Sequence, residues 1–139
     1  MAIMVAGPRT AAFLPSKMNK NGTASPGSSF APVQGWLADT SGSFPGSLVS
    51  GNEALVVQNA GGAVTISVSA TWSTFSTATV NINITVNGSV VQTNSQTGAS
   101  GTLTATWNGA VATGDFIRIE MKYSGSFAVS VTAGFVQVT

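Results

Sequence analysis

The sequence predicts an all-β fold: an antiparallel jelly-roll sandwich of about nine strands, preceded by an extended N-terminal arm. Three observations predict this fold. Apolar and polar residues alternate with a period of two along most of the chain, as in strands with one buried face. Turns that contain Gly separate these stretches at even spacing, and no stretch between the turns has convincing helical periodicity. The length of 139 residues indicates about one domain.

The first 32 residues are expected to form the arm, and residues 33–139 the jelly-roll domain. Pro and Gly recur in the first segment and prevent a long helix or a central strand there. Its apolar side chains are not needed by a solvated linker, so we expect them to fill grooves on a partner or neighbouring subunit; the alternative is that the arm packs on its own domain. The expected partner-binding residues are Ile3, Met4, Val5, Arg9, Phe13, Leu14, Lys17, Met18 and Lys20.

The first half of the domain contains three short candidate strands and one long one. Residues 33–37, 47–49 and 54–58 are the short ones. The long one, residues 64–72, alternates Val, Ile, Ala and Trp with Ser and Thr, which predicts one buried face.

A hairpin is predicted in the middle of the chain. Residues 80–86 repeat the alternation and end at Asn87 and Gly88, a pair that tolerates the positive φ angles of a type I′ turn. Residues 89–93 then form the returning strand.

The last third of the chain contains the remaining candidate strands. Asp115 lies just before one of them, where a turn-forming Asp is expected. Glu120 alternates with Arg118 and Lys122, which indicates a surface ion pair rather than a catalytic acid. The expected strands are residues 102–107, 117–123, 127–131 and 135–138.

Charge is scarce and unevenly distributed. Charged residues make up 6% of the chain and the net charge is +1, but the first 20 residues hold Arg9, Lys17 and Lys20 with no acid. A basic arm on a weakly acidic body favours docking to an acidic surface; the alternative is that the cations keep a tail soluble. The arm lacks a dense basic cluster and no stretch is long and apolar enough to span a membrane, so neither nucleic acid nor a membrane is an expected partner.

The residue types present exclude most enzyme chemistry. The chain has no Cys and no His, so a Ser–His–Asp site, a Cys–His site and a His- or Cys-ligated zinc site cannot be built. We therefore expect a protein that is not an enzyme and that carries no cofactor or metal. An enzyme would have to use at least two of the four carboxylates, which are Asp39, Glu53, Asp115 and Glu120.

The polar faces of the candidate strands carry Thr, Ser and Asn, where soluble proteins usually carry Lys and Glu. These residues cost less to desolvate than charges, and they protect strand edges poorly against pairing. Such a surface is suited to burial in a closed symmetric oligomer. Among the aromatic residues, Trp72 and Trp107 are in phase with the apolar face and are predicted to pack in the core, whereas Trp36 is a possible glycan contact.

Several segments together resemble the jelly rolls of the tumour-necrosis-factor-like family, which share their fold with the globular heads of the first complement component and with bacteriophage virion proteins. The similarity begins with Val-Gln-Gly-Trp-Leu-Ala-Asp at residues 33–39, Phe-Pro-Gly-Ser at 44–47 and Leu-Val-Val at 55–57, and it extends over the later strands. The resemblance implies a homotrimer with one sheet of each protomer around a three-fold axis. It makes Met121, Tyr123 and Phe127 candidate interface residues; the alternative is that they belong to the protomer's own core.

The function expected from these features is that of a homotrimeric bacteriophage capsid decoration protein. Its arm would dock to the major capsid protein or another virion protein, on the capsid surface rather than the tail, and would stabilise the shell. Deletion of residues 1–28 should then leave a folded trimer that cannot bind capsids. The alternative is a phage tail-tip or fibre head that binds host glycans through Trp36 or through loops at residues 39–47 and 93–101.

Overall fold

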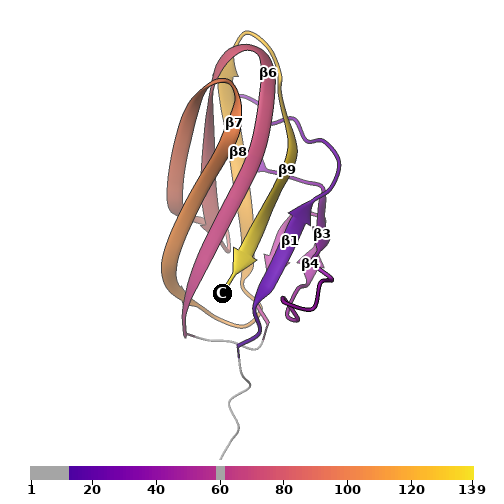
Figure 1. Cartoon of the computed structure of the whole chain (residues 1–139). Helices are drawn as coiled ribbons and strands as arrows, with labels where there is room; N and C mark the ends of the chain where they lie inside the picture. Colours follow the sequence, from indigo (N-terminus) through magenta and orange to yellow (C-terminus); the bar gives the residue numbers. More distant parts are fainter. Residues whose placement is uncertain (1–12, 59–61) are drawn as a thin grey trace, which may run out of the picture.

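The computed structural model describes residues 13–58 and 62–139 and confirms the all-β jelly-roll sandwich (Figure 1). Antiparallel pairing joins nine strands of the described segments into one hydrogen-bonded network. The strands are β1 (Ser16–Lys20), β2 (Ala31–Pro32), β3 (Trp36–Ala38), β4 (Val49–Ser50), β5 (Ala54–Val56), β6 (Gly62–Val86), β7 (Ser89–Val111), β8 (Phe116–Gly125) and β9 (Val129–Val138).

Two long strands, β6 and β7, divide this network into the two layers of a sandwich. The first part of β6 pairs with β9 and with the last part of β7, whereas residues 78–86 of β6 pair with β8 and with the first part of β7. The register shifts between Ser73 and Ala78, where β6 passes from one layer to the other. We call the layer β3–β1–β9–β6–β7 sheet I and the layer β4–β5–β8–β6–β7 sheet II; β2 pairs with β8 in sheet II.

The predicted strands at residues 64–72 and 80–86 are thus parts of one continuous strand. The stretch between them contains no Gly or Pro to end the strand, so the chain bends there and continues in the extended conformation.

The core fills the space between the two sheets. Alternate residues of each central strand point into it, because successive side chains in a strand point to opposite faces. Trp72 is buried as predicted, and its Nε1 donates a hydrogen bond to Oε1 of Gln96 at 2.7 Å. Trp107 is half-buried and packs against the core. Fully buried large side chains include Trp36, Met18, Leu55, Ile66, Ile82, Ile84, Ile117, Ile119 and Met121.

The predicted hairpin is present between β6 and β7. Asn87 and Gly88 have φ angles of 52° and 84°, the positive pair that a type I′ turn needs, and Val86 pairs with Ser89 across the turn.

The predicted boundary at residue 32 is wrong for the described residues before it. β1 pairs with β9 on one side and β3 on the other, so residues 16–20 are an interior strand of sheet I. Ala24 forms a bridge with Val131, and β2 pairs with β8. The Pro and Gly residues prevented a long element but not a short strand between Pro15 and Gly22, because Pro15 precedes the strand and does not interrupt its hydrogen bonds.

Candidate interaction surfaces

The outward face of sheet I is almost without charge. Strands β3, β6, β7 and β9 contain no Asp, Glu, Lys or Arg, and β1 supplies Lys17 and Lys20. Hydroxyl and amide groups on this face pair with one another: Thr71 Oγ1 lies 3.1 Å from Thr102 Oγ1, and Thr65 Oγ1 donates to Oδ1 of Asn108 at 2.7 Å. Neutral hydroxyl and amide groups on this face thus satisfy part of one another's hydrogen bonding, and such groups cost less to desolvate than charges.

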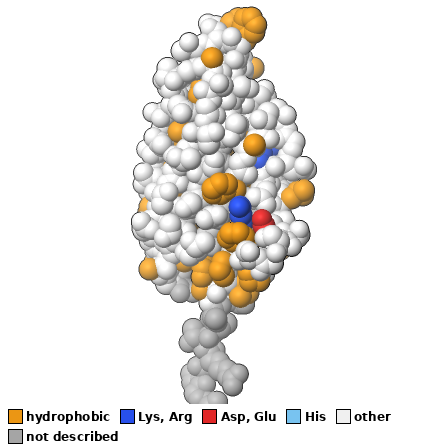
Figure 2. Space-filling model, in the orientation of Figure 1, with side chains coloured by type: hydrophobic (Ala, Val, Ile, Leu, Met, Phe, Trp, Pro, Cys, Tyr) orange, Lys and Arg blue, Asp and Glu red, His pale blue; other side chains and the backbone are white. Residues whose placement is uncertain are grey.

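Lys17 lies in an aromatic cluster on this face. Its Nζ is 5.2 Å from the centre of the Phe44 ring and 4.8 Å from that of Phe135, so the cation is shared by two rings. Figure 2, which shows the molecule as Figure 1 does, has hydrophobic side chains gathered beside a Lys or Arg in the lower half and a mostly white upper half. Hydrophobic side chains on this view thus gather in the lower half and at the upper tip.

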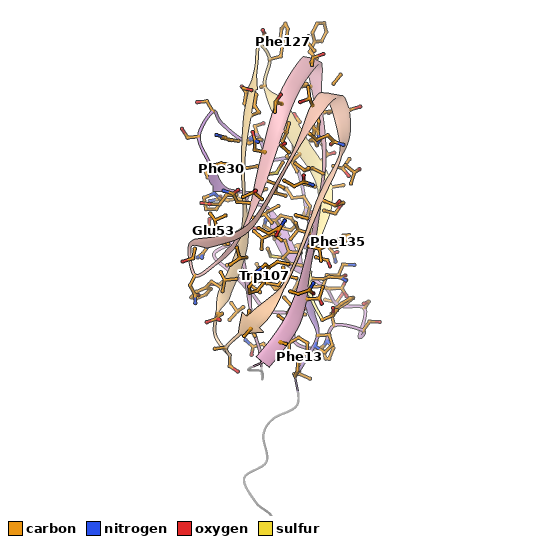
Figure 3. All side chains as sticks on the ribbon, turned by 90° about the vertical axis from the view of Figure 1, so that its left-hand side faces the viewer. Phe13, Phe30, Glu53, Trp107, Phe127 and Phe135 are labelled. Atoms are coloured by element: carbon orange, nitrogen blue, oxygen red, sulfur yellow. The ribbon has the colours of Figure 1, made fainter. Side chains whose placement is uncertain are left out.

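An aromatic pair forms a tip at one end of the sandwich. Phe75, on the bend of β6, and Phe127, before β9, have ring centres 5.0 Å apart and are 86% and 47% exposed. Figure 3 shows Phe127 at the end of the molecule opposite Phe13.

A polar groove crosses the outward face of sheet II. It has a volume of about 470 Å³ and is open to solvent. Its lining residues are Phe30, Asn81, Asn83, Thr93, Asn94, Ser95 and Lys122. Phe30 lies on the side of the sandwich opposite Phe135, so this groove and the aromatic cluster around Lys17 are on different faces (Figure 3).

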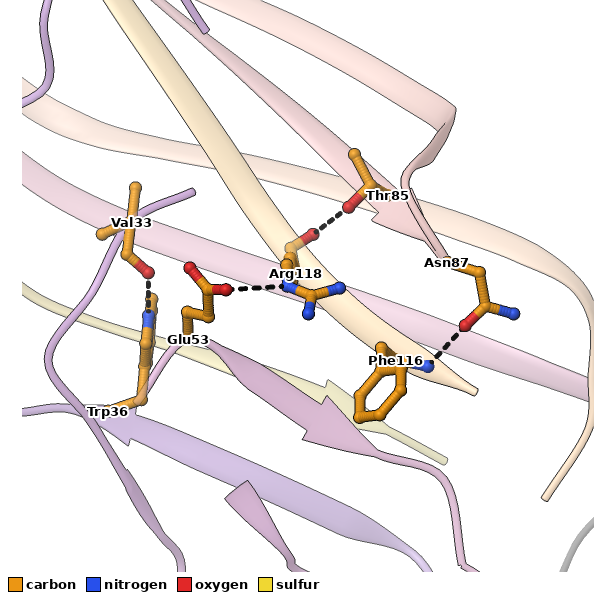
Figure 4. Close-up of polar contacts among 7 residues, drawn as sticks. All are labelled: Val33, Trp36, Glu53, Thr85, Asn87, Phe116 and Arg118. Carbon is orange, nitrogen blue, oxygen red and sulfur yellow. Dashed lines mark hydrogen bonds and ion pairs between the residues drawn. The ribbon is translucent and has the colours of Figure 1, made fainter. Parts of the chain in front are cut away.

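The acidic residues have structural roles rather than a common site. Glu53 Oε1 lies 3.4 Å from Nε of Arg118, so the ion pair on β8 forms with Glu53 and not with the predicted Glu120 (Figure 4). Asp115 occupies a turn as predicted: its Oδ2 accepts a hydrogen bond from the Ala112 N–H at 2.8 Å. The described residues contain no group of three or more acidic residues that could hold a metal ion.

Asp39 is the carboxylate with the most hydrogen-bond donors around it. The Ser41 hydroxyl and the Asn19 side-chain amide donate to its two oxygens, and the Ser41 N–H donates at 2.9 Å. These donors stabilise the charged form, and the Ser41 hydroxyl contributes most, so the pKa of Asp39 is lowered to about 2. Asp39 therefore fixes the loop after β3 in its ionised form.

The residues predicted to bind a partner through the arm have different environments. Met18 is fully buried in the core, so its predicted role is wrong, and Phe13 packs against the same core from its edge. Leu14 is half-buried, and Lys17 is the cation described above. Ile3, Met4, Val5 and Arg9 lie outside the described residues.

Lys20 also interacts with its own domain. Its Nζ donates to the carbonyl oxygens of Asn21 and Gly22 at 3.0 Å each and of Gly35 at 3.2 Å. Partial burial of its ammonium group lowers the pKa of Lys20. Two of the three cations of the predicted basic arm, Lys17 and Lys20, are thus part of the folded domain.

The predicted glycan contact Trp36 is wrong, because this residue is only 2% exposed. Its Nε1 donates to the Val33 carbonyl oxygen at 2.7 Å, which completes its polar contacts inside the protein (Figure 4). The predicted loop at residues 93–101 is also wrong, because this segment lies within strand β7.

The three residues predicted to form trimer contacts also differ in how far they are buried. Met121 pairs with Ile82 and is fully buried, so it belongs to the protomer's own core and cannot contact a partner. Tyr123 is half-buried against the core, and Phe127 is exposed at the tip. The sequence pattern located the apolar face of β8 correctly. It could not show whether the other sheet of the same protomer or a partner subunit covers that face.

Comparisons with known proteins identify the fold. No protein-family model matches the sequence, and a search of curated proteins finds no match. Among solved structures, Eiger TNF from S. frugiperda superposes with a TM-score of 0.66 at 12% identity, over 91% of this chain and 92% of that chain. Murine APRIL at pH 5.0 superposes with a TM-score of 0.53 at 15% identity, over 90% of this chain and 98% of that chain.

A second structure of murine APRIL, at pH 8.5, gives a TM-score of 0.52 at 14% identity, over 88% of this chain and 98% of that chain. The predicted tumour-necrosis-factor-like jelly roll is therefore confirmed. At these identities the likeness shows the fold alone.

Proposed function

We propose that this chain is a non-enzymatic structural protein that assembles as a homotrimer through the outward face of sheet I. The observation that carries the proposal is that β1 alone among the strands of sheet I carries charged residues, Lys17 and Lys20, and that Lys17 lies in an aromatic cluster. Burying this face removes few charges from water, whereas β8 of sheet II carries Arg118, Glu120 and Lys122. The tumour-necrosis-factor-like fold is consistent with a trimeric head.

We propose further that the trimer is a bacteriophage capsid decoration protein on the surface of the virion. Residues 1–12 lie before the described domain and contain Ile3, Met4, Val5 and Arg9, which combine apolar anchors with a cation. Three such segments on one trimer would raise the effective concentration of each at the shell. The partner would be the major capsid protein or another virion protein with an acidic, grooved surface.

Trimer formation is tested by light scattering on the purified chain. The wild-type protein should have three times the chain mass of 13.9 kDa. Thr106→Arg places a charge on the exposed face of sheet I and should yield monomers, whereas the matched change Ser124→Arg, on β8 of sheet II, should not. A wild-type monomer, or a trimer that tolerates Thr106→Arg and not Ser124→Arg, would exclude the assembly through sheet I.

Capsid docking is tested by co-sedimentation with shells assembled from the major capsid protein of the same virion. The full chain should sediment with these shells, and a chain lacking residues 1–12 should stay in the supernatant as a trimer. Equal sedimentation of both chains would show that the arm does not dock the protein. Failure of the full chain to sediment would exclude the capsid role.

A further inference from the structure

We infer that the groove on the outward face of sheet II is a binding site for a saccharide, recognised through its hydroxyl groups. This inference goes beyond the proposed function, because the groove lies on the sheet that the trimer leaves free and requires neither the trimer nor the capsid. Three features of the groove carry it: its hydrogen-bonding floor, a buried acceptor without a partner, and an aromatic wall.

The floor of the groove is a patch of neutral hydrogen-bonding side chains on the neighbouring strands β6 and β7, flanked by β8. Asn81 and Asn83 project from the central strand β6 to the same face, because they are two residues apart. Across the strand pairs, Asn83 faces Thr93 and Asn81 faces Ser95 on β7. On the other side Asn81 faces Lys122 of β8. Amide and hydroxyl groups both donate and accept, which is the property needed to bind neighbouring hydroxyls of a sugar ring.

Asn83 is the unusual member of this patch. Its side chain is 5% exposed, and its Oδ1 has no hydrogen-bond partner within residues 13–58 and 62–139. A buried polar atom without a partner costs stability, which an apolar side chain at this position would avoid. Asn83 also lines the groove, so a hydroxyl donor that reaches its Oδ1 from there would complete its hydrogen bonding.

Phe30 and Lys122 form the wall of the groove. Phe30 is 37% exposed, and Nζ of Lys122 lies 4.8 Å from the centre of its ring. A sugar ring has an apolar C–H surface and a rim of hydroxyls, and an apolar ring beside amide groups complements both. Pockets that bind small molecules commonly combine an apolar wall with a few polar groups that set orientation.

The charges of the lining argue for a neutral, hydroxyl-rich ligand. Lys122 is the single charged residue among those that line the groove, and its ammonium already lies over the Phe30 ring. A metal ion would need carboxylates, and a nucleic acid would need several cations along the groove.

The test is a titration of the isotope-labelled full chain followed by NMR. Galactose, glucose, mannose, N-acetylglucosamine and N-acetylneuraminic acid are added separately. At least one of the first four should shift the side-chain amide signals of Asn81 and Asn83 saturably. Asn81→Ala and Phe30→Ala should each weaken that binding at least tenfold. The matched controls Asn21→Ala and Phe75→Ala change exposed residues outside the groove and should bind as the wild type does.

Asn83→Val separates a binding role from a structural one. It should abolish binding while it raises the midpoint of thermal unfolding, because the unpartnered amide is replaced by an apolar strand former. A lower midpoint would assign Asn83 a structural role and overturn the inference. So would no shift with any sugar, equal binding by Asn81→Ala, or binding of N-acetylneuraminic acid alone that is lost in Lys122→Gln. The monomeric Thr106→Arg chain should still bind, so failure of the trimer proposal would be distinguishable.

Discussion

At the scale of single residues, neighbours in one short strand have opposite environments. Lys17 projects from sheet I toward two aromatic rings, whereas Met18 is fully buried. Both were expected to contact a partner, because a stretch of five residues bounded by Pro and Gly carries too little alternation to show a strand. Their burial is decided by β9, from the other end of the chain, which pairs with this segment.

Met18→Ala should therefore destabilise the isolated domain. Removing a fully buried Met side chain leaves a cavity, and such changes cost about 2–5 kcal/mol. Urea unfolding followed by tryptophan fluorescence measures this loss. Lys17→Ala, in the same strand, should cost much less because the Lys17 side chain faces outward. If the two variants were equally stable, Met18 would not be a core residue.

The hydrogen bonds around Asp39 predict a specific dependence of stability on pH. Its pKa is about 2 in the folded protein and near 4 in an unfolded chain, so its stabilisation is fully present above pH 4. As the pH falls from 4 to 2, Asp39 becomes protonated and this stabilisation is lost. Asp39→Asn should be less stable than the wild type at pH 7 and should lose less stability on acidification.

Urea titrations at several pH values between 2 and 7 provide the measurement. Ser41→Ala removes the hydroxyl that contributes most to the shift, so its loss of stability between pH 4 and 2 should lie between those of the wild type and Asp39→Asn. An Asp39→Asn protein with the wild-type acid dependence would contradict this assignment.

At the scale of elements, the long strands β6 and β7 each belong to both layers. Their alternation was apparent in the sequence, and so was the hairpin at Asn87 and Gly88. The continuity of β6 through Ser73 and Ala78 was not, because a gap in hydrophobic alternation is expected both for a loop and for a strand that bends away from the core.

Gly134 lies where strand β9 closely approaches its partner strand β6. Its φ is +149°, and a Cβ at this position would overlap the Ser69 carbonyl oxygen of β6. Gly134→Ala should lower the free energy of unfolding by about 1–3 kcal/mol, since both backbone strain and this contact oppose a side chain. Gly27→Ala is the matched control, because no atom lies within 4 Å of its added Cβ. Chemical denaturation of both variants checks this, and equal stability would show that β9 can shift away from β6.

At the scale of the whole molecule, the domain begins before the boundary that the sequence indicated. β1 covers the edge of β9, and Met18 completes the core beneath it. We therefore no longer expect a chain that lacks residues 1–28 to remain a folded trimer.

Two truncations distinguish the arm from the domain. Deletion of residues 1–12 leaves every described strand intact and should preserve the thermal midpoint measured by circular dichroism. Deletion of residues 1–28 removes β1, exposes the hydrogen-bonding edge of β9 and should produce a strongly destabilised or aggregated protein. A chain without residues 1–28 that unfolds at the wild-type temperature would show that β1 is dispensable.

The fold class, the hairpin and the apolar faces of the long strands could all be predicted from the amino-acid sequence. These features depend on local alternation and turn chemistry, which residues close in sequence specify. The sequence also excluded catalytic or metal sites built from Cys or His, because those residues are absent.

Which apolar residues are covered, and which polar residues lie together, depends on the packing of distant strands. Trp36, Met18 and Met121 become core because distant strands pack over them. Phe30 and Asn83 line one groove because β8 pairs with both β2 and β6, which brings the segment around β2 close to β6. Pairing between residues far apart in the chain depends on how all the strands pack together, so no local pattern specifies it. The scarce charge seen in the sequence thus became informative only when the structure showed that, among the strands of sheet I, β1 alone carries it.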